Sequence, residues 1–95
     1  MIKQINVGVI GTGWCGGIRA NACNSNPLVD KLYIAETNED RLNELKKNLN
    51  LTEATNEWRR LTKNPNIDTI IISATPEDTH YPMALEALKS GKNVF

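Results

Sequence analysis

The chain has 95 residues, of which 40% are hydrophobic, with 11 lysines and arginines against 11 aspartates and glutamates. A chain of this length forms one hydrophobic core rather than two. The net charge of zero excludes a broadly basic surface, so general nucleic-acid binding, which needs clustered Lys and Arg, is not expected. The pair Arg59-Arg60 is expected on a solvated helix face.

The cysteines and the hydropathy pattern indicate in which cellular compartment the protein is expected. No apolar run approaches the ~20 residues that cross a bilayer, and the first residues lack the apolar core of a signal peptide. Cys15 and Cys23, if both lie on one helix, are about 12 Å apart, beyond the ~7 Å limit between the Cα atoms of a disulfide. With only His80 to join them they do not make a four-ligand zinc set, and no metal site is expected. The sequence predicts a cytoplasmic protein with reduced thiols.

The first predicted element is a strand over residues 5–10, whose nearly continuous apolar character is typical of a parallel strand buried on both faces. A helix follows from about residue 14 to residue 25, where Asn26-Pro27 ends it. A second strand is expected over residues 31–35.

The next predicted helix begins at Asn38, a residue that caps helices well. Its leucines recur at the i, i+3, i+7 spacing of one buried stripe; they are Leu42, Leu45 and Leu49. A weak edge strand over residues 51–55 and a short helix over residues 56–63 complete this part of the chain.

The last part begins with the clearest strand, over residues 67–74. A helix over residues 79–90 follows, ended by Gly91 at the C′ position, and a strand begins at residue 92. The residues expected to form the buried stripe of this helix are Tyr81, Ala84, Leu85 and Leu88.

Strands and helices therefore alternate along the whole chain, with no linker or internal repeat. This alternation predicts an α/β fold of the Rossmann type, a doubly wound parallel sheet with helices on both faces. The expected strand order is 3-2-1-4-5, and the point where the order reverses lies between strands one and four.

The segment Gly11-Thr12-Gly13-Trp14-Cys15-Gly16 matches the G-x-G-x-x-G pattern between a predicted strand and a predicted helix. Gly11 would allow the tight turn, Gly13 the approach of a pyrophosphate and Gly16 the packing of helix on strand. The amides of Trp14 and Cys15 would face phosphate at the helix N-terminus. The alternatives are a glycine-rich turn without a ligand and, for Trp14, a packed aromatic.

Glu36 stands at the end of the second predicted strand, twenty residues beyond Gly16. A carboxylate there can accept hydrogen bonds from the ribose hydroxyls of adenosine. Thr37 and Arg41 are nearby, and Arg41 either lies over the adenine or is solvated. The alternative for Glu36 is an exposed loop acid.

The segment from Ser73 to His80 leaves the fourth strand, across the predicted crevice from the glycine loop. Three segments thus converge on one edge of the sheet, which is the usual place for a ligand in such folds. For His80 the alternative is a capping or packing residue.

Together these motifs resemble the N-terminal domain of the Gfo/Idh/MocA oxidoreductases. The resemblance covers essentially the whole chain and depends on residues 7–13, Glu36, Ala74-Thr75-Pro76 with His80, and Gly91-Lys92-Asn93-Val94. It implies a domain that binds NAD, with NADP less favoured, in an enzyme that moves hydride between the nicotinamide and a sugar, cyclitol or related polyol. The cofactor contacts that it implies are Gly11, Thr12, Gly13, Trp14, Cys15, Gly16, Glu36, Thr37, Arg41, Ala74, Thr75, Pro76 and His80.

Members of that family continue into a Glu-Lys-Pro motif with a catalytic lysine and into a substrate domain that usually carries the oligomer interface. We therefore expect residues 1–95 to be the dinucleotide-binding domain of a homo-oligomeric enzyme, inactive by itself, and assign no catalytic residue. Two alternatives stay open: a non-catalytic dinucleotide sensor and a nucleotide-sugar-binding domain.

Overall fold

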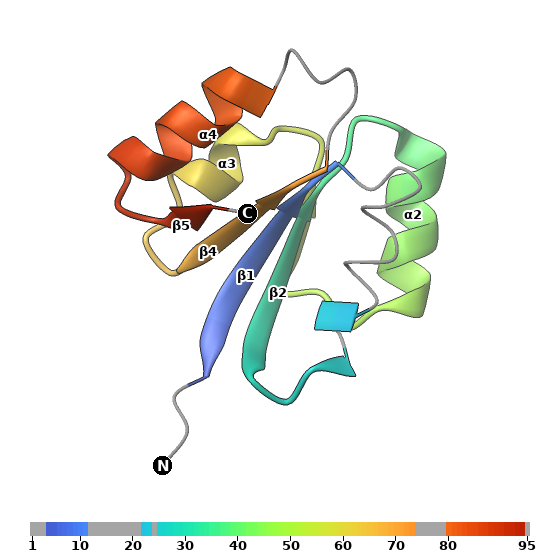
Figure 1. Cartoon of the computed structure of the whole chain (residues 1–95). Helices are drawn as coiled ribbons and strands as arrows, with labels where there is room; N and C mark the ends of the chain where they lie inside the picture. Colours follow the sequence, from blue (N-terminus) through green and yellow to red (C-terminus); the bar gives the residue numbers. More distant parts are fainter. Residues whose placement is uncertain (1–3, 12–21, 24, 74–79, 95) are drawn as a thin grey trace.

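The computed structural model describes residues 4–11, 22–23, 25–73 and 80–94, with only the backbone for residues 80 and 81. Figure 1 shows a central sheet with helices on both sides. The strands are β1 (Ile5–Ile10), β2 (Val29–Ala35), β3 (Glu53–Thr55), β4 (Thr69–Ile72) and β5 (Asn93–Val94). The helices are α2 (Glu39–Asn48), α3 (Arg59–Thr62) and α4 (His80–Lys89).

All strand pairs are parallel and the strand order is β3-β2-β1-β4-β5, so the predicted fold class and topology are confirmed. Residues that follow the strands continue the pairing. The Gly11 amide donates to the Ala35 carbonyl at 2.8 Å, and the Ser73 amide donates to the Ile10 carbonyl at 2.8 Å. The ends of β1, β2 and β4 therefore lie side by side at the carboxyl edge of the sheet.

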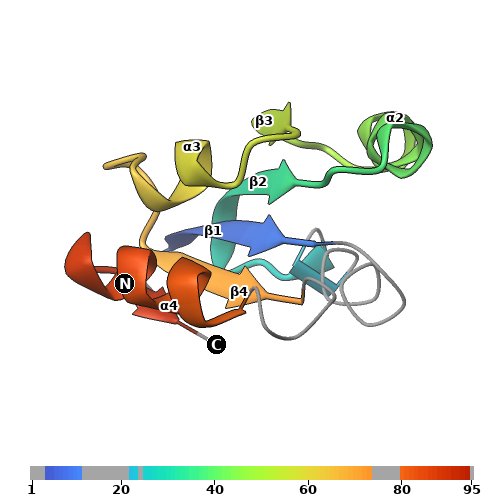
Figure 2. The ribbon, with the colours of Figure 1, turned by 90° about the horizontal axis from the view of Figure 1, so that it is seen from above.

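Alternation along the strands divides the core into two layers, one on each face of the sheet. In β1, Val7 and Val9 belong to the layer under α2, while Ile10 belongs to the layer under α3 and α4. Figure 2, which views the sheet along its edge, shows α2 on one side and α3 with α4 on the other. The predicted placement of helices on both faces is confirmed.

Gly8 of β1 faces the α3 and α4 layer, where neighbouring side chains leave little room for a larger residue. A Cβ atom at this position would lie 3.1 Å from Ile70 Cδ1 and 3.3 Å from Leu61 Cδ1. Distances this short force neighbouring side chains to move, because protein cores are packed closely. Glycine therefore lets Leu61 of α3 approach the sheet.

Helix α2 begins as predicted. The side-chain oxygen of Asn38 accepts a hydrogen bond from the Arg41 amide at 3.0 Å, which satisfies an amide that the first turn leaves without an intrahelical partner. All three leucines of the predicted stripe are buried. They pack onto the β1 and β2 valines and isoleucines, so α2 is fixed both at its start and along its length.

The stripe predicted for α4 is wrong at Leu85 and Leu88, whereas Ala84 is partly buried and packs against the core as predicted. Met83 and Ala87 are the buried residues of this helix, whereas Leu85 is 38% exposed and Leu88 is 60% exposed. Glu86 lies 3.5 Å from Arg59 Nε and 4.0 Å from Lys63 Nζ of the α3 region. In this orientation the small Ala87 packs into the core and Glu86 faces α3. The side chain of Tyr81 lies outside the described residues.

Several boundaries also differ from the predicted ones. β2 begins at Val29, two residues before the predicted start. Ile5 pairs with Val29 and Asn6 with Lys31, so Asp30 is an extra residue within this strand. β1 has the predicted bounds, whereas β3 begins at Glu53, β4 spans only Thr69–Ile72 and β5 begins at Asn93. The α3 helix begins only at Arg59. Of the first predicted helix, residues 22–23 and 25 are helical, and the rest lies outside the described residues.

Gly91 has a φ of +78° and stands at the end of α4, as predicted. Its conformation turns the chain so that the Lys92 amide donates to the Ala87 carbonyl at 3.1 Å. This is the glycine-terminated helix end that leads the chain back to a strand.

At the amino edge of the sheet, polar groups tie β1, β4 and β5 together. The Asn6 amide donates to an Asp68 carboxylate oxygen at 2.9 Å. Lys92 is only 7% exposed, and its Nζ donates to the Asn64 carbonyl at 2.5 Å and to the Ile67 carbonyl at 2.9 Å. Burial lowers the pKa of Lys92, although the nearby Asp68 charge acts in the opposite direction.

No helix among the described residues has the length and apolar character to cross a membrane.

Candidate cofactor site

The carboxyl edge of the sheet carries the described residues of the predicted site. Gly11 follows β1 with a φ of +82°, a conformation that favours glycine and that the predicted tight turn requires. Its amide is held by the carbonyl of Ala35, the last residue of β2. The start of the glycine segment is therefore fixed directly beside Glu36.

Glu36 is buried, with 7% of its surface exposed, so it is not the exposed loop acid that was the alternative. Its amide donates to the Thr55 carbonyl at 2.9 Å, and its Oε2 accepts from the Asn38 amide at 2.9 Å. The backbone around Asn38 thus holds Glu36 in one position where β2 passes into α2.

Arg41 lies in the first turn of α2, and its Nη1 atom is 3.7 Å from Glu36 Oε1. Its side chain is 47% exposed. Thr37, between the two, is exposed. The predicted position of Arg41 near the site is correct, but the ion pair with Glu36 was not predicted. The signal for it is the Asn38 cap, which fixes where the helix begins and therefore which residue turns back toward Glu36.

The other predicted contacts are described only in part. The backbone of His80 is the first residue position of α4. Eight predicted contacts lie outside the described residues and stay predictions: Thr12, Gly13, Trp14, Cys15, Gly16, Ala74, Thr75 and Pro76.

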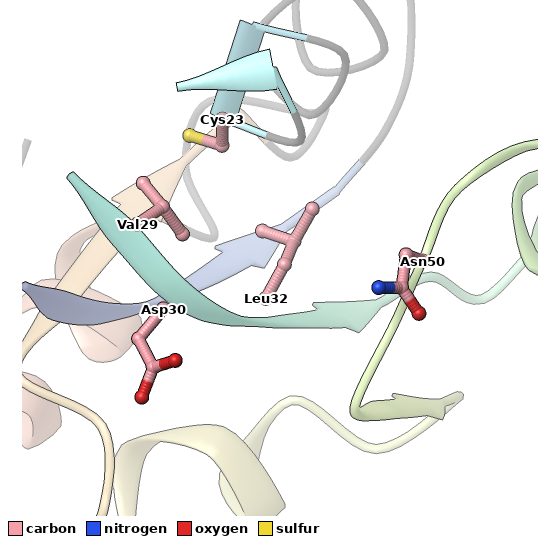
Figure 3. Close-up of a pocket in the computed structure, with 5 residues that line it drawn as sticks. All are labelled: Cys23, Val29, Asp30, Leu32 and Asn50. Carbon is pink, nitrogen blue, oxygen red and sulfur yellow. The ribbon is translucent and has the colours of Figure 1, made fainter. Parts of the chain in front are cut away.

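A hollow of about 200 Å³ lies at the start of β2, far from this edge. Cys23, Val29, Asp30, Leu32 and Asn50 line it (Figure 3). The Asp30 carboxylate points away from Cys23 in this view, and burial raises the pKa of the Cys23 thiol. A raised pKa disfavours the thiolate, the reactive form of cysteine. The hollow lies by the first residues of β2, whereas Glu36 follows the last one, so the hollow is not part of the candidate cofactor site.

Within the described ranges, no three His, Cys, Asp or Glu residues gather in a way that could hold a metal ion. The carboxyl edge instead offers a buried carboxylate after β2 and a left-handed glycine after β1. A carboxylate after the second strand and a glycine that allows a tight turn after the first strand are features of dinucleotide-binding folds, and the ligand contacts themselves stay predictions.

Comparisons with known proteins agree with this geometry. A family model described as "Oxidoreductase family, NAD-binding Rossmann fold" matches residues 5–95. The myo-inositol 2-dehydrogenase of Thermotoga maritima is 31% identical over 93 residues, which cover 96% of this chain and 27% of that enzyme. The scyllo-inositol 2-dehydrogenase (NADP(+)) of Bacillus subtilis is 28% identical, over 98% of this chain and 25% of that enzyme.

Among solved structures, the scyllo-inositol dehydrogenase of Lactobacillus casei with bound NAD(H) and scyllo-inositol has a TM-score of 0.87. It is 26% identical, and the match covers 98% of this chain and 27% of that chain. The chain thus spans about a quarter of the length of the relatives it matches.

Proposed function

Because the chain belongs to the Gfo/Idh/MocA family of oxidoreductases, we propose that residues 1–95 act as the dinucleotide-binding domain of a dehydrogenase. The substrate class that we propose is a sugar, a cyclitol or a related polyol. Its support is that relatives of this chain include enzymes named for inositols. Substrate contacts and the catalytic proton carrier would come from polypeptide outside this domain.

The observation that carries the proposal is the buried Glu36 beside Gly11 at the carboxyl edge. The nicotinamide of a bound dinucleotide supplies the hydride acceptor or donor. Glu36 would accept hydrogen bonds from the adenosine ribose, and the turn at Gly11 would open the glycine segment toward the pyrophosphate. The domain's task is to bind and orient, and we propose no catalytic residue in it.

We further propose that the domain prefers NAD to NADP and that Glu36 sets this preference. A carboxylate attracts ribose hydroxyls but repels a 2′-phosphate that carries nearly two negative charges. At ~4 Å and an effective dielectric constant near 20, one pair of unit charges costs on the order of 4 kcal/mol before screening. Solvent reduces this strongly, so we expect a preference of tens-fold to hundreds-fold, about 1.4–2.8 kcal/mol.

The test is to measure the dissociation constants of NAD and NADP by calorimetry for the wild-type chain and Glu36→Ala. We expect the preference for NAD in the wild type and a clear loss of it in the variant. Gly13→Val is the companion variant. We expect it to abolish binding of both cofactors while its circular dichroism spectrum remains that of a folded chain. Equal wild-type affinities, or a ratio that Glu36→Ala leaves unchanged, would remove Glu36 from this role.

For the whole protein we propose a cytoplasmic homo-oligomer without nucleic-acid or membrane partners. The balanced charge of the chain supports the absence of a nucleic-acid partner, and the spacing of its two cysteines supports reduced thiols. The homo-oligomer is proposed from membership of the family, in which the oligomer interface usually lies in the substrate domain.

A further inference from the structure

Both oxygens of the Glu36 carboxylate face the first turn of α2. Oε2 accepts a hydrogen bond from the Asn38 amide at 2.9 Å, and Oε1 lies 3.7 Å from Arg41 Nη1. Glu36 itself is buried, and its backbone amide is bonded to the Thr55 carbonyl. The backbone of Glu36 is therefore fixed by the sheet, whereas the position of its carboxylate depends on where the helix begins.

Asn38 sets where the helix begins. Its side-chain oxygen accepts from the Arg41 amide at 3.0 Å, and its carbonyl accepts from the Leu42 amide at 2.9 Å. Its own backbone is extended, with a φ of −81° and a ψ of 110°, which is the conformation of a residue that caps a helix. The cap thus fixes two groups at once: the Asn38 amide that binds Oε2, and the residue whose guanidinium faces Oε1.

We propose that Asn38 is a positioning residue for cofactor recognition, whose side-chain cap holds the Glu36 carboxylate in the orientation that binds the ribose hydroxyls. The proposal rests on the proposed function, since it concerns how Glu36 is presented to the ribose. Asn38 acts through Glu36 and not by touching the cofactor. Because capping and ribose binding then favour the same conformation, each stabilises the other. Ribose recognition is thereby coupled to the start of α2.

The cap can be removed without removing the helix. Glu39 and Asp40 in the first turn interact favourably with the N-terminal end of the helix dipole. Leu42 and Leu45 are buried against the sheet. In Asn38→Ala these interactions remain, and so does the backbone amide that binds Glu36. The variant loses the side-chain oxygen, and the helix start that this oxygen holds becomes about fivefold less populated.

The experiment compares two nucleotides that differ only in the ribose hydroxyls: adenosine 5′-monophosphate (AMP) and its 2′,3′-dideoxy analogue. Both are titrated calorimetrically into the 95-residue chain. The wild type should bind AMP at least about tenfold more tightly than the analogue, because the hydroxyls donate to a carboxylate. In Asn38→Ala this ratio should fall about fivefold, almost entirely through weaker binding of AMP. Asn38→Ser should keep the wild-type ratio, since serine caps a helix about as well as asparagine does.

Asn26→Ala is the matched control. Asn26 makes the same kind of side-chain hydrogen bond just before β2, where its Oδ1 accepts from the Leu28 amide at 2.9 Å. This variant removes an equivalent bond at the opposite end of the strand, and we expect it to leave the ratio unchanged. The proposal is overturned if the ratio falls equally in Asn26→Ala, or if Asn38→Ala weakens both nucleotides equally. It is also overturned if Asn38→Ser lowers the ratio as much as Asn38→Ala does.

Amide hydrogen exchange of the wild type tests the coupling without any substitution. The Arg41 amide should exchange more slowly with AMP bound than with the dideoxy analogue bound at the same saturation, because the hydroxyls favour the capped start. Equal protection by the two nucleotides would contradict the coupling.

The Glu36→Ala variant separates this inference from the proposed function. An unchanged ratio in Asn38→Ala, with the ratio lost in Glu36→Ala, overturns the role of Asn38 alone. A folded wild type that binds neither nucleotide, or that does not distinguish them, overturns the proposed role of Glu36 and this inference with it.

Discussion

At the scale of single residues, two charged side chains are buried, and the sequence predicts a role for only one of them. Glu36 and Lys92 are charged residues at the ends of strand regions, and each is 7% exposed. The order of elements predicts the place of Glu36, because a loop at the end of the second strand is a known ribose site. Nothing in the local pattern predicts that Lys92 is buried, since its two partners are carbonyls from a turn some 25 residues earlier in the chain.

Lys92 should make stability depend on pH in the alkaline range. Burial lowers its pKa in the folded state below the ordinary value of 10.5, so the unfolded chain binds more protons between the two values. The free energy of unfolding should therefore rise with pH across this window through the contribution of Lys92. The contribution of Lys92 is measured by urea unfolding of the wild type and of Lys92→Met between about pH 8 and 10. The difference between their free energies of unfolding isolates Lys92, because the other titrating groups are common to both. Parallel curves for the two proteins would contradict the assignment.

At the scale of elements, strand order and helix placement could be predicted, and the rotation of one helix could not. The α2 stripe was predictable because one set of leucines fits the helical period and the other positions are polar. Helix α4 has apolar residues on more than one face, so periodicity alone does not select the buried one. The contacts that distinguish the two faces of α4, Ala87 against the sheet and Glu86 toward α3, are tertiary.

The observed rotation of α4 predicts opposite sensitivities on its two faces. Met83→Ala should lower the free energy of unfolding by about 2–4 kcal/mol, because it leaves a cavity against the sheet. Leu88→Ala should change it by less than about 0.5 kcal/mol, since this side chain is already 60% exposed. Urea titration of both variants provides the comparison. A larger loss for Leu88→Ala than for Met83→Ala would restore the stripe that the sequence predicted.

At the scale of the whole molecule, the described surface has an apolar flank beside an edge strand. Leu85 and Leu88 are exposed on α4, and β5, which contacts this helix, ends the strand order. Edge strands and exposed apolar side chains both favour association between molecules. The 95-residue chain alone should therefore self-associate.

Sedimentation velocity over a range of concentrations measures this association. The wild-type chain should show a sedimentation coefficient that rises with concentration, whereas the double variant Leu85→Lys, Leu88→Lys should stay monomeric. Arg60→Gln serves as a surface control that leaves the leucines in place. A wild-type chain that is strictly monomeric at high concentration would contradict the expectation.

The ion pair of Glu36 and Arg41 and the polar contacts of Lys92 lie at opposite ends of the parallel strands. The six residues of β1 span about 20 Å, beyond the roughly 7–10 Å within which substitutions usually influence one another. Free-energy changes from the two ends should therefore add. Protein engineering can use this independence: a variant stabilised at the amino edge would tolerate cofactor-altering substitutions at the carboxyl edge that the native chain cannot accommodate. The same additivity lets a substitution at the amino edge restore stability that a change at the carboxyl edge has cost.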